Sequence, residues 1–123
     1  MPKTVLVVDD SAMMRKVFIN NLTAAGLVVN VLESPNGQDA LEKFKGGGID
    51  CVLSDWNMPI MDGITLVREI RKCDPAKRVT IIMITTEGSP DKVKEAVLAG
   101  ANNYLVKPFT PERFKEKLSK VLA

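Results

Sequence analysis

The chain has 123 residues, the length of one domain, and its 46% hydrophobic and 26% charged residues are typical of a globular protein. A formal net charge of +2, without any run of five like charges, gives no reason to expect binding to nucleic acid or to a membrane surface. The sequence contains no histidine, which excludes Ser–His–Asp and Cys–His catalysis, histidine-ligated metal sites and phosphohistidine on this chain.

The first part of the sequence predicts two strands and two helices. The β-branched run at residues 4–8 is typical of a buried strand. Ser11 is a suitable N-cap for a helix that has one apolar face and ends at Gly26. A second strand is expected at residues 28–33, and a second helix at about residues 38–45, where three glycines end it.

The remaining sequence continues the same alternation. Strands are expected at residues 51–54, 79–84 and 102–106. A helix that ends near Asp74 separates the first two of these strands, and a helix bounded by Ser89 and Gly100 separates the last two. A final helix begins with the cap-and-proline pair at Thr110. Alternating strands and helices with short connections predict an open, doubly wound α/β domain with a parallel sheet between two layers of helices.

The remaining predictions outside the motifs concern the cysteines and the N-terminus. Cys51 and Cys73 match no metal spacing or redox motif, so free thiols in a reducing cytoplasm are expected. The short apolar run at the N-terminus ends in two acids and is neither a signal peptide nor a transmembrane span.

Polar side chains follow four of the predicted strands. In chain order these are Asp9 and Asp10, then Asp55, then Thr85 with Thr86 behind it, and finally Lys107. Because parallel strands end at the same edge of a sheet, these side chains are expected to converge there. Two carboxylates about 4 Å apart repel by roughly 4 kcal/mol at an effective dielectric constant near 20, so three of them need a cation or protonation. Oxygen ligands without histidine or thiolate favour a hard divalent ion, Mg²⁺ by default.

Four motifs carry a resemblance to a known family. The segments VVDDS, SDWNMPIMDG, ITTEG and YLVKPF, in this order, resemble the receiver domain of two-component response regulators, most closely the single-domain chemotaxis regulators of the CheY type. The resemblance extends over essentially the whole chain and implies one receiver domain at residues 1–123. It also implies the flavodoxin-like strand order 2-1-3-4-5.

The resemblance implies a role for each acid. Asp55 is expected to accept a phosphoryl group from a phosphohistidine on a sensor histidine kinase of the CheA type, forming an acyl phosphate. Asp10 is expected to ligate Mg²⁺ directly, and Asp9 to contribute partly through water. Asn57 offers its backbone carbonyl as a further ligand, and the ion bridges Asp55 and the phosphoryl oxygens.

Further residues are implied to bind the phosphoryl group or to respond to it. Lys107, whose bond to Pro108 is expected to be cis, pairs with the phosphoryl group, and Thr85 donates its hydroxyl to it. Thr85 then vacates space that Tyr104 fills, which reshapes the face of the fourth helix, fifth strand and fifth helix where partners dock. Asn57 and Glu87 resemble the pair of fast-hydrolysing members, so a short-lived phosphorylated state is expected.

The sequence therefore predicts a stand-alone cytoplasmic switch and not an enzyme, beyond self-phosphorylation from small donors and autodephosphorylation. Its expected partners are the sensor kinase, a downstream protein that is the flagellar motor switch in chemotaxis, and possibly a phosphatase. A phosphorelay intermediate that passes phosphate to a histidine phosphotransfer protein is the alternative. A haloacid-dehalogenase phosphatase would need Asp-x-Asp after the first strand and a longer chain, and a flavodoxin-like electron carrier would need a Ser/Thr/Gly-rich phosphate loop there.

Overall fold

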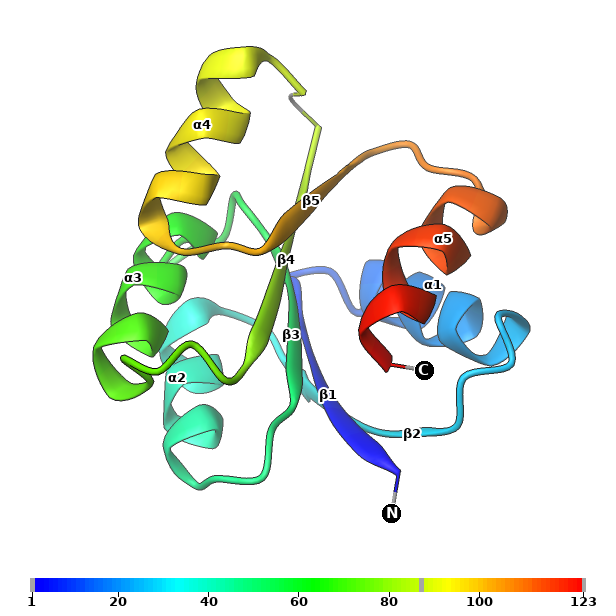
Figure 1. The fold of residues 1–123 in the computed structure, drawn as a ribbon, viewed down its shortest axis with the longest axis horizontal. Coiled ribbons are helices and arrows are strands. Elements are labelled where there is room, and N and C mark those ends of the chain that lie inside the picture. The colour runs from blue at the N-terminus through cyan, green and yellow to red at the C-terminus, as the bar shows by residue number, and fades with distance from the viewer. Residues whose placement is uncertain (1, 87, 123) are drawn as a thin grey trace.

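The computed structural model describes residues 2–86 and 88–122 and has the predicted alternation of strands and helices (Figure 1). The strands are β1 (Lys3–Val8), β2 (Val29–Ser34), β3 (Cys51–Asp55), β4 (Thr80–Thr85) and β5 (Asn103–Val106). The helices are α1 (Ala12–Ala24), α2 (Gly37–Lys45), α3 (Gly63–Cys73), α4 (Pro90–Ala99) and α5 (Pro111–Leu122). Each predicted element is present, and its observed ends lie within one or two residues of the predicted ones.

The strands form one parallel sheet in the order β2-β1-β3-β4-β5, as predicted. The register aligns the ends of the central strands, with Val8 beside Ser54 and Asp55 beside Ile84. The carboxyl ends of all strands therefore lie along one edge of the sheet, which is the upper edge in Figure 1. Within the described residues, no helix is both long and apolar enough to cross a membrane.

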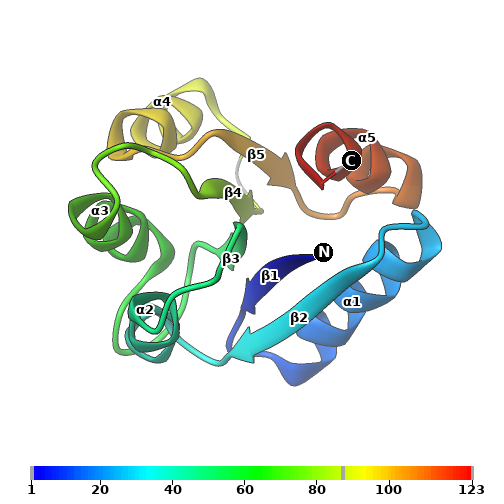
Figure 2. The ribbon, with the colours of Figure 1, turned by 60° about the horizontal axis from the view of Figure 1, so that its bottom comes forward.

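Helices cover both faces of the sheet. Helices α1 and α5 lie on one face, and α2, α3 and α4 lie on the other (Figures 1 and 2). Side chains alternate between the two faces along each strand. On β1, Val5 and Val7 pack in the cluster with α1 and α5, whereas Leu6 and Val8 pack in the cluster with α2 and α3.

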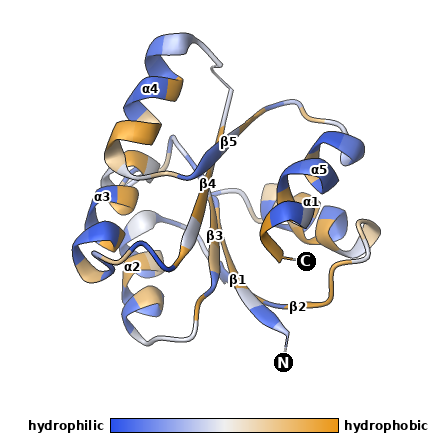
Figure 3. Cartoon of the chain, in the orientation of Figure 1, coloured by the Kyte–Doolittle hydropathy of each residue, from blue (hydrophilic) through white to orange (hydrophobic). Residues whose placement is uncertain are grey.

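The core has two apolar layers, one on each face of the sheet. The central strands β3 and β4 are largely apolar along their length (Figure 3), and the helices contribute further buried apolar side chains, such as Phe18 and Phe114. Four successive residues of β1, from Val5 to Val8, are fully buried because helices cover the strand from both sides. Cys51 belongs to the same interior, and burial raises the pKa of its thiol to about 12. It is a small core residue, as predicted, whereas Cys73 is exposed.

Side-chain caps and a left-handed residue define several helix ends. The Ser11 hydroxyl accepts a hydrogen bond from the N–H of Met14 at 3.2 Å and caps α1, as predicted. Asp62 caps α3 in the same way by accepting from the N–H of Thr65 at 2.9 Å. Ser89 occupies the cap position of α4 but makes no side-chain capping bond, and Gly100 ends that helix with φ +119°.

Candidate functional site

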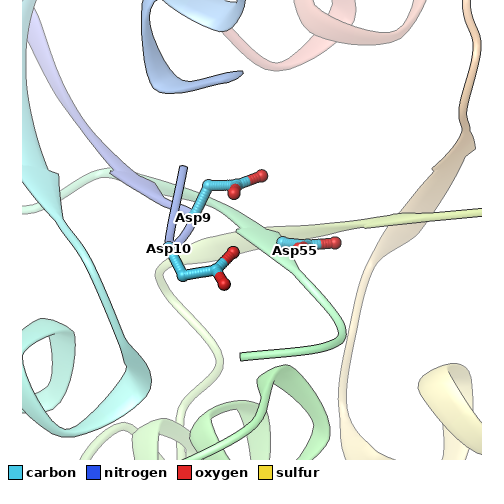
Figure 4. Close-up of side chains that lie close together, drawn as sticks. All are labelled: Asp9, Asp10 and Asp55. Atoms are coloured by element: carbon cyan, nitrogen blue, oxygen red, sulfur yellow. The ribbon is translucent and has the colours of Figure 1, made fainter. Parts of the chain in front are cut away.

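Three carboxylates meet at the carboxyl edge of the sheet. Asp9 and Asp10 follow β1 and Asp55 ends β3, its neighbour in the sheet. One oxygen from each of the three side chains lies within 4.8 Å of the others, and the carboxylates gather in one small region (Figure 4). The sequence-based expectation that the acids converge is therefore met by the geometry.

The three acids differ in exposure and in local hydrogen bonding. Asp9 is 1% exposed and Asp55 is 9% exposed, whereas Asp10 lies at the surface. The N–H of Ser11 donates to Asp9 Oδ1 at 2.9 Å, and the N–H of Trp56 donates to Asp55 Oδ1 at 2.9 Å. Backbone donors thus hold the two buried carboxylates, and the exposed Asp10 opens the cluster to solvent.

Lys107 brings a positive charge into this cluster. Its Nζ lies 3.2 Å from Asp55 Oδ1 and 3.4 Å from Asp9 Oδ2, and its side chain is 16% exposed. The chain after β5 is held in place by the N–H of Lys107, which donates to the carbonyl of Thr85 at 2.7 Å. The Lys107–Pro108 peptide bond is cis, as predicted.

The charge balance of the cluster is visible in the pKa of Asp9. Burial raises this pKa above its usual range, and the nearby Asp55 carboxylate raises it further. The Ser11 N–H and the Lys107 ammonium act in the opposite direction and do not compensate. The positive groups beside Asp9 therefore do not fully stabilise its ionised form, which a further cation would favour.

The donor set fits a hard divalent cation. When the three acids are ionised, their charge exceeds that of the Lys107 ammonium, and all three offer oxygen ligands of the kind that Mg²⁺ prefers. Asn57, expected to add a backbone carbonyl, is exposed in the loop that follows β3.

Thr85 and Tyr104 lie on neighbouring strands next to this cluster. Thr85 ends β4 and is 5% exposed. It pairs with Val106 in the sheet, and Met83 pairs with Tyr104. Because residues two apart on a strand point to the same face, Thr85 and Tyr104 share the face that α2, α3 and α4 cover. Tyr104 is half-buried and borders a cavity of about 290 Å³ between β5 and α5.

Two further basic residues contact the site and had not been singled out in the sequence. Arg15, in the first turn and a half of α1, donates from Nη1 to the carbonyl of Asp9 at 2.6 Å and from Nε to Glu33 at 3.0 Å. Lys92 of α4 places its Nζ 4.9 Å from the centre of the Trp56 ring. Their spacing from the acids along the chain carries no periodic signal, so only the fold reveals them. Glu87 lies outside the described residues.

Comparisons with known proteins agree with this geometry. The family model of the response regulator receiver domain matches residues 5–119. Chemotaxis protein CheY1 of Helicobacter pylori is 49% identical over 118 residues, which cover 95% of this chain and 94% of that protein. The chemotaxis protein CheY homolog of Campylobacter jejuni is 46% identical over 95% of this chain and 90% of its own length.

Solved structures with the same fold include chemotaxis regulators. Vibrio cholerae CheY4 has a TM-score of 0.88 at 38% identity, with 99% of this chain and 100% of that chain covered. The CheX-CheY-BeF3-Mg complex of Borrelia burgdorferi contains a chain with a TM-score of 0.89 at 32% identity, with 100% of this chain and 91% of that chain covered.

Proposed function

This chain belongs to the response regulator receiver domain family, and we propose that it is a chemotaxis switch operated by phosphorylation of Asp55. The observation that carries the proposal is the position of the Asp55 carboxylate. It lies at the end of a buried strand, within reach of two other acids and 3.2 Å from the Lys107 ammonium. An acid held in this way is suited to accept a dianionic group, because positive charge is already present beside it.

The proposed reaction is a phosphoryl transfer from a histidine of a sensor kinase. An Asp55 carboxylate oxygen forms a bond to phosphorus while the P–N bond to the imidazole breaks, and the imidazole nitrogen keeps the electron pair. The backbone N–H of Trp56, which donates to Asp55 Oδ1, orients the carboxylate. Lys107 already contacts the acceptor and is placed to pair with the incoming phosphoryl oxygens, as Thr85 is from the end of β4.

Asp9, Asp10 and Asp55 are the residues that would hold Mg²⁺, with the backbone carbonyl of Asn57 as a further ligand. When bound, the ion supplies positive charge that stabilises the transferring phosphoryl oxygens. The solved complex from Borrelia burgdorferi carries Mg²⁺ and BeF3, which supports the same assignment for this chain.

The proposed output is a change on the face formed by α4, β5 and α5. A phosphoryl group adds roughly 1.5 to 2 negative charges and three acceptor oxygens beside Thr85. Movement of Thr85 toward it frees volume on the sheet face that Tyr104 shares, and the Tyr104 ring can turn into this volume. We assign the flagellar motor switch as the partner that senses this face, and we assign Asn57 and Glu87 to the rate of dephosphorylation.

The proposal is tested by phosphorylation with a small donor. With Mg²⁺ and acetyl phosphate, the intact protein is expected to gain the mass of one phosphoryl group and to change the fluorescence of its single tryptophan, Trp56. Asp55→Asn is expected to abolish the mass gain. Asp62→Asn is the matched control, since Asp62 lies in the same loop and caps α3, and asparagine also caps. An unchanged mass gain in Asp55→Asn would assign the acceptor elsewhere.

The output is tested with the phosphorylated protein. Binding to an isolated motor-switch protein is expected to strengthen on phosphorylation and to weaken again in Tyr104→Ala. Transfer of the phosphoryl group to a histidine phosphotransfer protein, without phosphorylation-dependent binding to the motor switch, would instead identify a relay intermediate.

A further inference from the structure

A second cavity opens next to the acid cluster, on the side of α1 and α5. Its volume is about 300 Å³, at the lower end of the range for small-molecule sites. Its lining residues come from α1, from the end of β4 and from the loop between β5 and α5: Met14, Val17, Thr86, Lys107, Pro108 and Phe109. Among these lining residues, Lys107 alone carries a charge.

The cavity has a rigid apolar wall. The Phe109 ring lies 6.0 Å from the Phe18 ring and 5.5 Å from the Phe114 ring, measured between ring centres. Phe18 and Phe114 are fully buried, so this wall is fixed to the core of the domain. The Phe109 side of the cavity is therefore held in position by the packed core.

Lys107 joins the cavity to the proposed phosphorylation site. Its side chain lines the cavity, and its ammonium lies 3.2 Å from Asp55 and 3.4 Å from Asp9. A ligand that reached both places would have an anionic end at Lys107 and a short apolar end against Met14, Val17 and Phe109. A small acyl phosphate has this shape and charge.

We propose that this cavity binds the acyl group of a small acyl phosphate while its phosphoryl group is transferred to Asp55, so that the chain selects among donors by the length of their acyl chain. The inference rests on the proposed function of Asp55. In the reaction, an Asp55 oxygen forms a bond to phosphorus and the bond between phosphorus and the acyl oxygen breaks. The donor leaves as a carboxylate with the electron pair, and no proton is exchanged.

The test compares donors that differ in the acyl chain alone. Acetate, propionate and butyrate are leaving groups of nearly equal basicity, so acetyl, propionyl and butyryl phosphate differ mainly in the apolar surface they can bury. Burial of one methylene group corresponds to a factor of about four, so the two methylene groups added from acetyl to butyryl phosphate are expected to raise the rate of Asp55 phosphorylation about fifteenfold. Phosphoramidate, which carries no acyl group, is the reference donor, and each acyl-phosphate rate is divided by the phosphoramidate rate of the same variant.

Two substitutions in the cavity lining and one control outside it test whether the cavity binds the acyl chain. Val17→Phe adds volume to the lining and is expected to remove the rise from acetyl to butyryl phosphate. Met14→Ala removes volume from the lining, so the rise in rate is expected to continue to acyl chains longer than butyryl. This variant introduces no larger side chain, so its folding does not depend on accommodating one. Met13→Phe is the matched control, because Met13 is adjacent in sequence, is 77% exposed and does not line the cavity. It is expected to keep the donor series of the original chain.

The outcomes distinguish this inference from the function on which it rests. If phosphoramidate and the acyl phosphates all fail to phosphorylate Asp55, both proposals are overturned. If phosphoramidate reacts but the acyl series is flat, or is unaffected by Val17→Phe and Met14→Ala, the acyl site alone is overturned. If these substitutions change only the transfer from a sensor kinase, the cavity is a protein-docking feature and the acyl site is likewise overturned.

Discussion

Asp9 is the residue where folding and the proposed chemistry conflict most directly. It is nearly fully buried, faces Asp55 and shares Lys107 with it. Its raised pKa means that the folded state disfavours the ionised form relative to the unfolded chain. A site that must hold a cation can tolerate this cost, because the cation removes it when bound.

Substitution of Asp9 by asparagine is expected to stabilise the protein in the absence of divalent cations. For an acid whose folded-state pKa is raised, the folded state binds more protons, so stability falls as the pH rises from the unfolded pKa through the folded one. Asp9→Asn is therefore expected to raise the free energy of unfolding by about 1 kcal/mol at pH 7, with a smaller effect near pH 4.

Urea denaturation with a chelator measures this difference, and the same titration with saturating Mg²⁺ is expected to reverse its sign, because Asp9→Asn loses a ligand. Asp50→Asn is a control, since Asp50 is exposed and precedes β3, at the opposite end of the strand from Asp55, and asparagine can still accept the hydrogen bond from the N–H of Thr4. A loss of stability in Asp9→Asn at pH 7 without cations would show that Lys107 fully compensates the buried charge.

At the level of single residues, the sequence predicted the acids and Lys107 from their positions after strands. That argument needs only strand direction, which the alternation of elements supplies. Arg15 and Lys92 could not be found in this way, because each reaches its target from a helix surface across a tertiary contact. The capping of α3 by Asp62 is likewise apparent only from the bond that its side chain accepts from the N–H of Thr65.

At the level of elements, the backbone at the start of α3 lies in close contact with the backbone of the proposed acceptor. The N–H of Gly63 donates to the carbonyl of Trp56 at 2.8 Å. A Cβ atom on Gly63 would collide with the carbonyl oxygen of Asp55 and would lie within 3.0 Å of the Trp56 Cα. Gly63 is thus required by the close approach of two backbones, and this approach sets the position of β3 relative to α3.

Gly63→Ala is expected to lower the free energy of unfolding by about 1–3 kcal/mol, the usual cost of forcing atoms into a packed region. Because the colliding atom belongs to Asp55, the rate of phosphorylation by phosphoramidate is expected to fall as well. Thermal or urea unfolding and the mass-gain assay measure the two effects.

Gly46→Ala is the control, since Gly46 ends α2 with φ −67° and is exposed. Its free energy of unfolding is expected to stay within about 0.5 kcal/mol of the original value. An equal loss in both variants would contradict a specific contact between α3 and the acceptor.

Element boundaries show where sequence patterns lose accuracy. The third strand was predicted to end at Ser54 and the second helix to begin near Gln38, whereas the strand includes Asp55 and the helix begins at Gly37. Hydrophobic periodicity does not mark a polar strand residue such as Asp55. Gly37 is a weak helix former, but its N–H donates to the carbonyl of Met61 at 3.1 Å, a tertiary bond that local propensity does not contain.

At the level of the whole molecule, the proposed site and a second polar cluster lie at opposite edges of the sheet. Arg71, at the end of α3, donates to the carbonyls of Gly100 and Val79, each at 2.9 Å, and to the side chain of Asn102 at 2.8 Å. It also pairs with Asp74, whose pKa is held below its usual range chiefly by the N–H of Val79. This one side chain connects α3, the start of β4 and the turn between α4 and β5.

Arg71→Met is expected to destabilise the domain without changing its chemistry. The Arg71 side chain is 9% exposed, so its loss leaves partly buried carbonyl oxygens without a donor, at a cost of roughly 3 kcal/mol in the free energy of unfolding. Arg71 contacts the amino end of β4, whereas the acids lie at the carboxyl ends of β1 and β3. The rate of Asp55 phosphorylation is therefore expected to stay unchanged at temperatures where the variant is folded. Arg68→Met, an exposed position on the same helix, is expected to shift the unfolding free energy by less than about 0.5 kcal/mol. Urea unfolding together with the phosphoramidate rate measures both, and a loss of rate in folded Arg71→Met would mean that the two edges of the sheet are coupled through β4.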